Sequence, residues 1–320
     1  MRFIRLILAK SAFGLAWTLF SVILLIGCSR NPAAAVAAVL DRAREPDVDQ
    51  QTLETTVTAL ADLGPEAVEP ILQGMSDEDY NISNVCELAL LSMQGAESKI
   101  TAIALSQQSQ RRLRFNALFV IRDSHFQTRD SSLATLMSDP EPKIRWAAAG
   151  CASRGDPDRL SPALFRLLKS RQRTDVIAAT YSLARLLRKK AASSLAELLV
   201  NSDAQIAGAA ADALAEIRSL EHAKPIAKLL GSRDLALRVR ALRDLEWMNS
   251  PVSDIETAKA LQRLPSRQQA ELISQILPTS KGLIRLVVRN LGKSSDPAVS
   301  QAVRTLRAKK WQGEAIDTGK

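Results

Sequence analysis

A 31-residue period in the hydrophobic pattern is the feature that most constrains how this chain can fold. One position of the period is small in most repeats, and it is occupied by Cys86, Ala117, Ala148, Ala179, Ala210 and Ala241. Small side chains at a fixed helical position let neighbouring helices approach closely. Periods of this length indicate a repeat architecture, and they take precedence over any domain count based on length.

A second set of apolar positions has the same period and indicates a second helix in each repeat. It includes Leu133, Leu164, Leu195 and Ile226, with a leucine three residues after each. Apolar residues at i, i+3 and i+4 are typical of helices, and nothing in the pattern indicates a strand. Ser-Asp and Asp-Pro pairs between repeats favour helix starts. The pattern predicts an all-α fold, a right-handed α-solenoid of about eight 31-residue helical hairpins over residues 51–310, in which stacking buries the apolar stripes.

Residues 139–149, with the sequence Asp-Pro-Glu-Pro-Lys-Ile-Arg-Trp-Ala-Ala-Ala, resemble the HEAT-repeat family, and most closely its short bacterial variety named after the phycobilisome lyases. The resemblance implies a scaffold or binding protein, and we expect the second helices to line its concave face. It also implies that the arginine at one repeat position pairs with an aspartate of a neighbouring repeat and is structural; these arginines are Arg114, Arg145 and Arg238. Asp175 and Gln268 depart from the apolar pattern, and we expect their helices to be shifted or bent.

Residues 1–27 have the parts of a secretory signal peptide. Three basic residues and no acid precede an uncharged run from Ser11 to Ile26, which is shorter than the roughly 20 residues that span a bilayer. The sequence Leu25-Ile26-Gly27-Cys28 then resembles the lipobox of bacterial lipoproteins. The resemblance implies acylation of Cys28, followed by a tether and a first short helix up to residue 50. An uncleaved signal anchor is the alternative.

These N-terminal features predict a lipoprotein anchored to a membrane of the bacterial cell envelope. Positive residues before an apolar run remain inside, so the rest of the chain is expected to face the periplasm or the cell exterior. Ser29, directly after the cysteine, resembles the outer-membrane sorting pattern of enteric bacteria, which favours the outer over the inner membrane.

Patterns typical of catalysis or metal binding are scarce. His125 and His222 are the two histidines, and neither belongs to a His-Glu pair of the kind that HEAT-like iron hydroxylases repeat. Cys86 and Cys151 lack the spacing of zinc ligands and lie two repeats apart, so we expect two buried, unpaired thiols. We predict no enzyme activity, no cofactor and no metal. The alternative is a HEAT-like lyase or a small-ligand-handling protein, which would have acids, bases or thiols clustered in a concave pocket.

Charge is distributed unevenly along the chain. Residues 29–110 contain four basic and thirteen acidic residues, whereas residues 111–320 contain 36 basic and 21 acidic ones. The basic part predicts a surface that binds a protein, an anionic lipid or an acidic glycan. Its candidate residues are Arg111, Arg112, Arg171, Arg173, Arg188, Lys189, Lys190, Arg240 and Arg243. A merely solvated face is the alternative reading of the same residues.

Export of the chain and the scarcity of stacking aromatics argue against nucleic acid as the partner. Trp146 and Trp247 are expected to fill gaps between helices rather than to anchor a ligand. The sequence therefore predicts a lipid-anchored scaffold or adaptor of the cell envelope, with residues 311–320 as a polar tail. A structural spacer that holds parts of the envelope apart is a further alternative.

Overall fold

The computed structural model describes residues 31–44 and 48–316, so Cys28 and the signal segment lie outside the described residues. All regular secondary structure within those two ranges is helical, which confirms the all-α class. No helix there is both long enough and apolar enough to cross a bilayer. The chain divides into an N-terminal unit, Met1–Leu136, and a C-terminal unit, Met137–Lys320.

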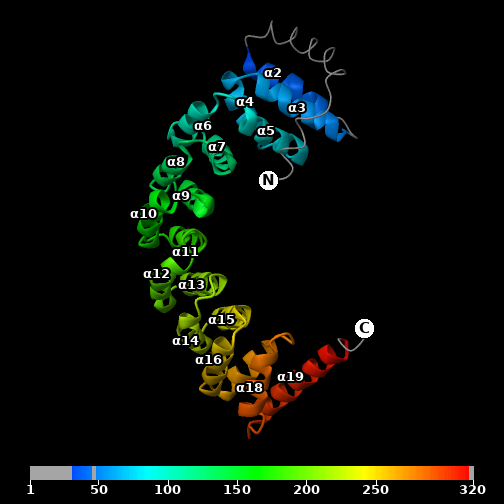
Figure 1. Ribbon diagram of the computed structural model, residues 1–320, viewed down its shortest axis with the longest axis vertical. Helices are drawn as coiled ribbons and strands as arrows, with labels where there is room; N and C mark the ends of the chain where they lie inside the picture. Colours follow the sequence, from blue (N-terminus) through cyan, green and yellow to red (C-terminus); the bar gives the residue numbers. More distant parts are fainter. Residues whose placement is uncertain (1–30, 45–47, 317–320) are drawn as a thin grey trace. The chain divides into compact units, whose positions relative to one another are not determined.

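The N-terminal unit begins with one helix and continues as three helical hairpins (Figure 1). Its helices are α2 (Pro32–Leu40), α3 (Gln50–Asp62), α4 (Val68–Gly74), α5 (Tyr80–Ser92), α6 (Glu97–Leu105), α7 (Arg111–Asp123) and α8 (Arg129–Leu136). The first helices α3, α5 and α7 pack against one another in order, and the second helices α4, α6 and α8 do the same.

The C-terminal unit contains five further hairpins and a last helix. Its helices are α9 (Pro142–Cys151), α10 (Pro157–Leu168), α11 (Arg173–Leu187), α12 (Ala192–Ala196), α13 (Ala204–Glu216), α14 (Ala223–Lys228), α15 (Leu235–Met248), α16 (Pro251–Gln262), α17 (Ser266–Gln275), α18 (Lys281–Leu291) and α19 (Pro297–Ile316). Short 3-10 helices adjoin several of these helices in both units; they are Asp41–Arg44, Pro65–Ala67, Ala152–Arg154, Arg188–Ala191, Glu197–Val200, Leu220–His222 and Leu229–Gly231.

The predicted period is confirmed by where the first helices begin. From α7 onward they start 31 residues apart, at Arg111, Pro142, Arg173, Ala204, Leu235, Ser266 and Pro297. Aspartates cap several of these starts, because a carboxylate oxygen accepts a backbone N–H that the first turn leaves without a partner. Asp203 accepts from the N–H of Gln205, and Asp234 from that of Leu237. Together α3 to α18 form eight hairpins of a HEAT-like solenoid, over the part of the chain that is described.

The turn inside each hairpin requires left-handed backbone in several repeats. Gly64 and Gly95, which follow the first helices α3 and α5, have φ angles of +76° and +74°. Glycine adopts this region without the steric cost that a Cβ adds. In the C-terminal unit the corresponding turns use Arg188, Arg218 and Asn249 at φ angles of 53°, 50° and 44°. The glycine signal of the turn is therefore lost there although the turn remains.

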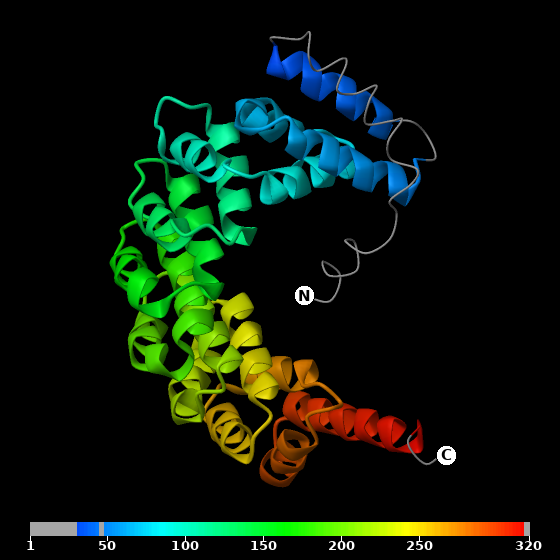
Figure 2. The same cartoon turned by 45° about the horizontal axis from the view of Figure 1, so that its top comes forward.

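The seam of small side chains holds the first helices together. Cys86 and the alanines of the same repeat position, such as Ala148 and Ala210, are completely buried. The distance between helix axes depends on the side chains at the contact, so a seam of alanines brings the first helices close together. Figures 1 and 2 show the consequence within the C-terminal unit, where the odd-numbered helices form one layer on the inner side of the bend and the even-numbered helices form the other. The expectation that the second helices line the concave face is therefore wrong for this unit.

Candidate functional site

The repeat arginines are held inside the fold. Arg145 forms an ion pair of 3.0 Å with Asp175 of the next hairpin, and it donates to the carbonyl oxygens of Asp139 and Pro140 in the loop before its own helix. Arg238 repeats the arrangement with the carbonyl oxygen of Ser232 and with Glu271 of the next hairpin. Arg114, in the N-terminal unit, is 5% exposed and donates to the carbonyl oxygen of Ala104. Each arginine fastens the connection between successive hairpins.

Asp175 does not disturb its helix, contrary to the expectation from the sequence. Helix α11 begins 31 residues after α9, and it remains continuous for 15 residues. Asp175 is 1% exposed because it is the acidic partner of Arg145, and it also accepts a hydrogen bond from Ser170. Helix α17 likewise begins in step; next to Gln268, the side chain of Gln269 is buried and donates to the carbonyl oxygen of Leu264.

The basic candidate residues do not come together into one patch. Arg111 and Arg112 are exposed at the start of α7 in the N-terminal unit. In the C-terminal unit, Arg171 and Arg173 lie at the start of α11, whereas the exposed run 188–190 follows its end. Fifteen residues at 1.5 Å each separate these two groups by roughly 22 Å. The two groups therefore lie at opposite edges of the layer of first helices.

Arg240, also a basic candidate, lies in a polar cluster that crosses three first helices. Its Nε donates to Asp212 on α13 over 2.7 Å, and its Nη2 donates to the hydroxyl of Tyr181 on α11 over 2.7 Å. The Tyr181 hydroxyl in turn donates to Asp212 over 2.6 Å. Arg243, the last candidate, forms an ion pair of 2.9 Å with Glu246. The guanidinium groups of both arginines are thus engaged within the chain.

A glycine makes room for this cluster. A Cβ at Gly208 on α13 would lie 2.6 Å from Nη1 of Arg240 and 2.9 Å from its Cδ. The Arg240 side chain therefore rests on the bare backbone of α13. Charge-assisted hydrogen bonds of this kind hold planar guanidinium groups in a fixed orientation.

Asp244, one turn after Arg240 on α15, completes the cluster from below. Its residue is 8% exposed, and its Oδ2 has no hydrogen-bond donor to accept from among the described residues. Burial, and then the charge of Asp212, raise the pKa of Asp244 to about 8. A protonated Asp244 can donate to Asp212, and this satisfies an oxygen that would otherwise be unpaired. Burial and the hydrogen bond to Asp212 raise the pKa of Tyr181 to about 12, so Tyr181 remains a neutral donor.

The sequence analysis missed Tyr181, Asp212 and Asp244. Tyr181 and Asp212 occupy the same position in successive repeats, 31 residues apart, and this spacing was the available signal. The cluster holds one proton and balances its charges internally. Neither of the two concavities described below includes these residues.

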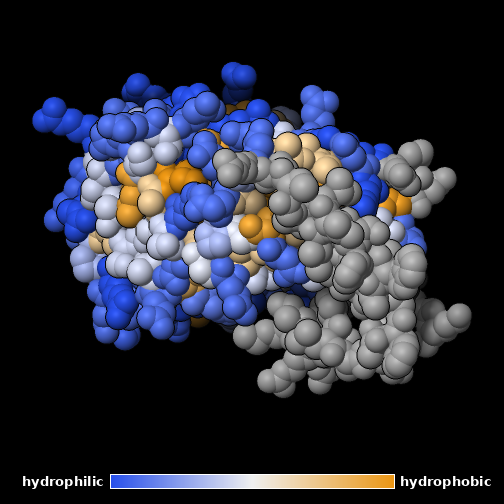
Figure 3. Space-filling model, turned by 90° about the horizontal axis from the view of Figure 1, so that it is seen from above, coloured by the Kyte–Doolittle hydropathy of each residue, from blue (hydrophilic) through white to orange (hydrophobic). Residues whose placement is uncertain are grey.

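The two tryptophans among the described residues are exposed, so the expectation that they fill gaps between helices is wrong. Trp146 on α9 is 50% exposed and Trp247 on α15 is 69% exposed. Both belong to the layer of first helices in the C-terminal unit. The gaps between these helices are closed by the alanine seam, which leaves no space for an indole ring. Hydrophilic side chains cover most of the face drawn in Figure 3, with hydrophobic residues in small patches between them.

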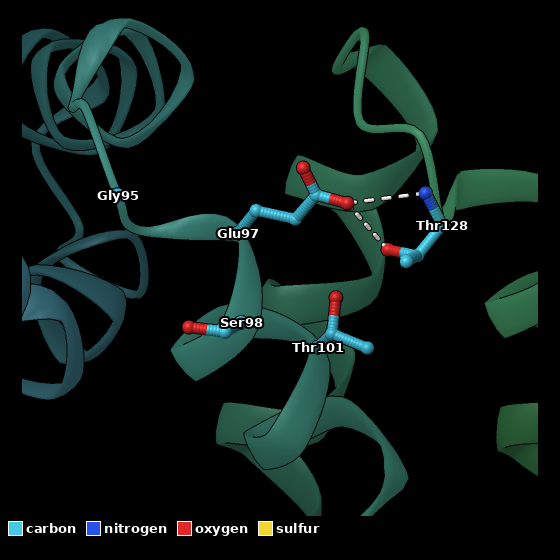
Figure 4. A pocket seen from close by; sticks show the side chains of 5 residues that line it. All are labelled: Gly95, Glu97, Ser98, Thr101 and Thr128. Carbon is cyan, nitrogen blue, oxygen red and sulfur yellow. Dashed lines mark hydrogen bonds between the residues drawn. The ribbon is translucent and has the colours of Figure 1, made fainter.

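A pocket of about 330 Å³ lies in the N-terminal unit and is lined by Gly95, Glu97, Ser98, Thr101 and Thr128 (Figure 4). Glu97 accepts hydrogen bonds from both the backbone N–H and the hydroxyl of Thr128, and these bonds lower its pKa. Since the Glu97 carboxylate is tied to the second hairpin, the pocket is a polar joint between α6 and the loop before α8. A groove of about 580 Å³ in the C-terminal unit runs from Leu199 to Ala207 and from Lys228 to Leu237.

The thiols and histidines have no arrangement typical of catalysis. Cys86 and Cys151 are both buried, as predicted, and no disulfide forms between residues that the structure describes. Burial raises the pKa of Cys86 to about 12, which leaves little of the reactive thiolate. His222 contacts the Ser219 hydroxyl over 2.9 Å at a helix start. Over the described ranges, no group of three or more His, Cys, Asp or Glu side chains could hold a metal ion.

Comparison with solved structures supports the fold. The chain is similar to Kap95p, whose structure was solved with RanGDP: the two are 8% identical, the match covers 94% of this chain and 49% of that chain, and the TM-score is 0.52. It also matches YibA of Escherichia coli (13% identity, 93% and 98% coverage, TM-score 0.44) and the complex of CpcE and CpcF of phycocyanin lyase from Nostoc (17% identity, 77% and 94% coverage, TM-score 0.37).

No family model matches the chain. No curated protein matches its sequence. The fold is that of a HEAT-like α-solenoid, a class of all-α proteins built from stacked helical hairpins. At these sequence identities the likeness shows the fold alone.

Proposed function

We propose that this protein is a lipid-anchored scaffold of the bacterial cell envelope, and that it binds a protein partner on the first-helix layer of its C-terminal unit. The observation that carries the proposal is the exposure of Trp146 and Trp247 on that layer. Tryptophan, tyrosine and arginine dominate the residues that contribute most to protein–protein binding. A fold with 46% hydrophobic residues has ample interior in which to bury two indoles, yet both remain in contact with solvent.

The surroundings of the two tryptophans support a protein partner. Three helix-to-helix steps of roughly 8–10 Å separate α9 from α15, so the two indoles span a surface that fits a folded domain or a long segment. Between them lie Tyr181 and Arg240, whose orientations are fixed by Asp212. Rigid side chains lose little entropy on binding, which favours affinity. Kap95p, a protein of the same fold, binds RanGDP in its structure.

The exposed basic residues at both ends of α11 then form part of the rim of this surface. Arg171 and the run 188–190 are exposed, and Arg173 has a loose 3.6 Å contact with Asp203. Rim charges mainly speed association and select for partners of opposite charge. We therefore propose a partner that is acidic where it meets α11, with an anionic lipid or glycan as other possible ligands of the rim and no role for nucleic acid.

We further propose that Cys28 is acylated and holds the chain at a membrane, with the solenoid facing the periplasm or the cell exterior. The apolar run that ends at Gly27 and the cysteine after it support this proposal. A binding role without catalysis is supported by the internally balanced Tyr181 cluster and by the raised pKa of the Cys86 thiol.

A photo-reactive amino acid at single positions tests the protein-binding proposal in intact cells. We expect position 146 and position 247 to cross-link to the same protein, because both face the same layer. Tyr80 is the matched control, since it is an aromatic residue that is 79% exposed but lies in the N-terminal unit. Cross-linking of the same protein from position 80 with equal yield, or no protein from either tryptophan position, would contradict the proposal.

A further inference from the structure

Eight exposed cationic residues cover the second-helix layer near the end of the C-terminal unit. They are Lys224, Lys228, Lys259, Arg263, Lys281, Arg285, Arg289 and Lys293. They lie on three neighbouring helices or directly after them, since α14 packs against α16 and α16 packs against α18 (Figure 1). We call these eight residues the cationic face.

The cationic face is a two-dimensional array. On α18, Lys281, Arg285 and Arg289 follow one another at four-residue steps, so they lie on one side of the helix about 6 Å apart. Lys293 continues the row beyond the helix end. Two helix-to-helix steps of roughly 8–10 Å separate α14 from α18. The array therefore extends over nearly 20 Å in both directions.

Few opposite charges balance this array. Helices α14 and α18 contain no acidic residue, and the acids of α16, Asp254 and Glu256, are half-buried. Within the described part of the chain, Lys259 is the one member of the face with an ion-pair partner, Glu256 at 2.8 Å. Like charges at i and i+4 of a helix destabilise it. A row of cations that weakens its own helix and contacts no acid points to a ligand outside the chain.

Two apolar side chains lie exposed beside the cations. Val252 and Ile255 on α16 are 46% and 42% exposed, at the centre of the three-helix surface. Basic residues around exposed aliphatic side chains are typical of surfaces that lie against a lipid bilayer, where the cations meet anionic head groups and the apolar groups enter the boundary with the acyl chains.

We propose that the cationic face docks the C-terminal unit onto an anionic lipid surface. An extended acidic segment of a protein would need one row of cations, whereas head groups in a membrane form a plane that matches the array in both directions. The face lies on the layer opposite to the one that carries Trp146 and Trp247. Membrane docking and protein binding therefore use different layers, and neither depends on the other.

Vesicle binding by the full chain tests this proposal. Every chain carries Cys28→Ser, so that acylation cannot contribute. The test variant replaces four cations of one row by glutamine: Lys281→Gln, Arg285→Gln, Arg289→Gln and Lys293→Gln. The control variant removes four exposed cations elsewhere in the C-terminal unit and has the same net charge: Lys143→Gln, Arg154→Gln, Lys169→Gln and Arg267→Gln. Co-sedimentation compares vesicles of phosphatidylcholine with and without about one third phosphatidylglycerol.

We expect the unsubstituted face to bind the anionic vesicles and not the neutral ones. The test variant should bind at least about tenfold more weakly, since each lysine or arginine near an anionic surface contributes a several-fold factor. The control variant should stay within about twofold of the parent. Equal losses in both variants would overturn the proposal, because binding would then follow net charge. Binding to polyglutamate without binding to anionic vesicles would overturn it in favour of an acidic protein partner.

A third variant separates charge from hydrogen-bond geometry. Arg263→Lys, Arg285→Lys and Arg289→Lys keep every charge but remove the planar fork that pairs with carboxylates. Lipid docking requires the charge alone, so this variant should retain binding within about twofold. A loss as large as that of the glutamine variant would overturn the proposal. Circular dichroism of each variant verifies that the helices remain folded.

Discussion

Replacing Asp244 by asparagine should abolish a pH dependence of stability that we attribute to the Tyr181 cluster. Burial and the charge of Asp212 raise the pKa of Asp244 from 3.8 to about 8 in the folded chain. Between these two values the folded chain holds a proton that the unfolded chain releases. The free energy of unfolding therefore falls as the pH rises through this window, and no further loss from this site occurs above it.

The magnitude follows from the size of the pKa change. A rise of about four pKa units at 1.36 kcal/mol per unit corresponds to roughly 6 kcal/mol across the window. This value is an upper limit, because structural relaxation and water reduce the penalty of the ionised form; we expect at least about 2 kcal/mol. Asparagine keeps the shape of the protonated acid and can donate to Asp212 at every pH.

Urea denaturation followed by circular dichroism measures the effect. Both proteins are compared at each pH between 5 and 9 in the same salt, so that contributions of all other groups cancel. Near pH 5 the two should differ little, and near pH 9 the Asp244→Asn variant should be more stable by about 2 kcal/mol or more. A difference that stays constant over the whole pH range would refute the reasoning, because Asp244 would then not titrate within it.

Three other substitutions test separate parts of the account. Gly208→Ala should lower stability by about 1–3 kcal/mol in thermal melts because its Cβ would overlap the arginine resting on α13, whereas Gly150→Ala, with open space around its Cβ, should raise it by up to about 1 kcal/mol. Arg145→Ala should cost about 3–5 kcal/mol in urea denaturation because it leaves the buried Asp175 without its charge partner; a change below about 1 kcal/mol would contradict this. Cys28→Ser should move the protein from the membrane to the soluble fraction in low-salt extracts supplemented with neutral vesicles, and an unchanged distribution would argue against the lipid anchor.

The fold could be predicted from the sequence because its information is local and repeated. The alanine position recurs at one helical register, and each recurrence reports the same buried seam. Asp175 shows the limit of this method. The single deviation was interpreted as a defect of the helix, whereas its partner Arg145 lies in the preceding repeat. A pairwise contact between repeats is invisible to a column that reads one position at a time.

The candidate surfaces were harder to predict, because the sequence does not show on which side of the stack a residue lies. Arg171 and the run 188–190 are close in sequence but are separated by the whole length of α11. Trp146 has the composition of a core residue and is exposed because alanines already fill the seam. The four-residue spacing of the cations on α18 could have been recognised, although its neighbours on α14 and α16 follow only from the packing.

The row of cations on α18 has a consequence for stability that is independent of any ligand. Lys281 with Arg285, and Arg285 with Arg289, are like-charge pairs at i and i+4, and each destabilises the helix by about 0.2–0.5 kcal/mol. Glutamine has nearly the same helix propensity as lysine and arginine. The glutamine variant of this row should therefore be more stable than the parent by about 0.5–1 kcal/mol at low salt, and the gain should shrink as salt screens the charges.

The control variant provides the comparison for this last effect. Lys143, Arg154, Lys169 and Arg267 do not form such a row, so their replacement should leave the melting temperature nearly unchanged. A residue that lowers stability without contributing to packing is retained when function requires it. A glutamine row that melts lower than the parent would show that these side chains stabilise the fold. The argument that their charge serves an external ligand would then lose its physical basis.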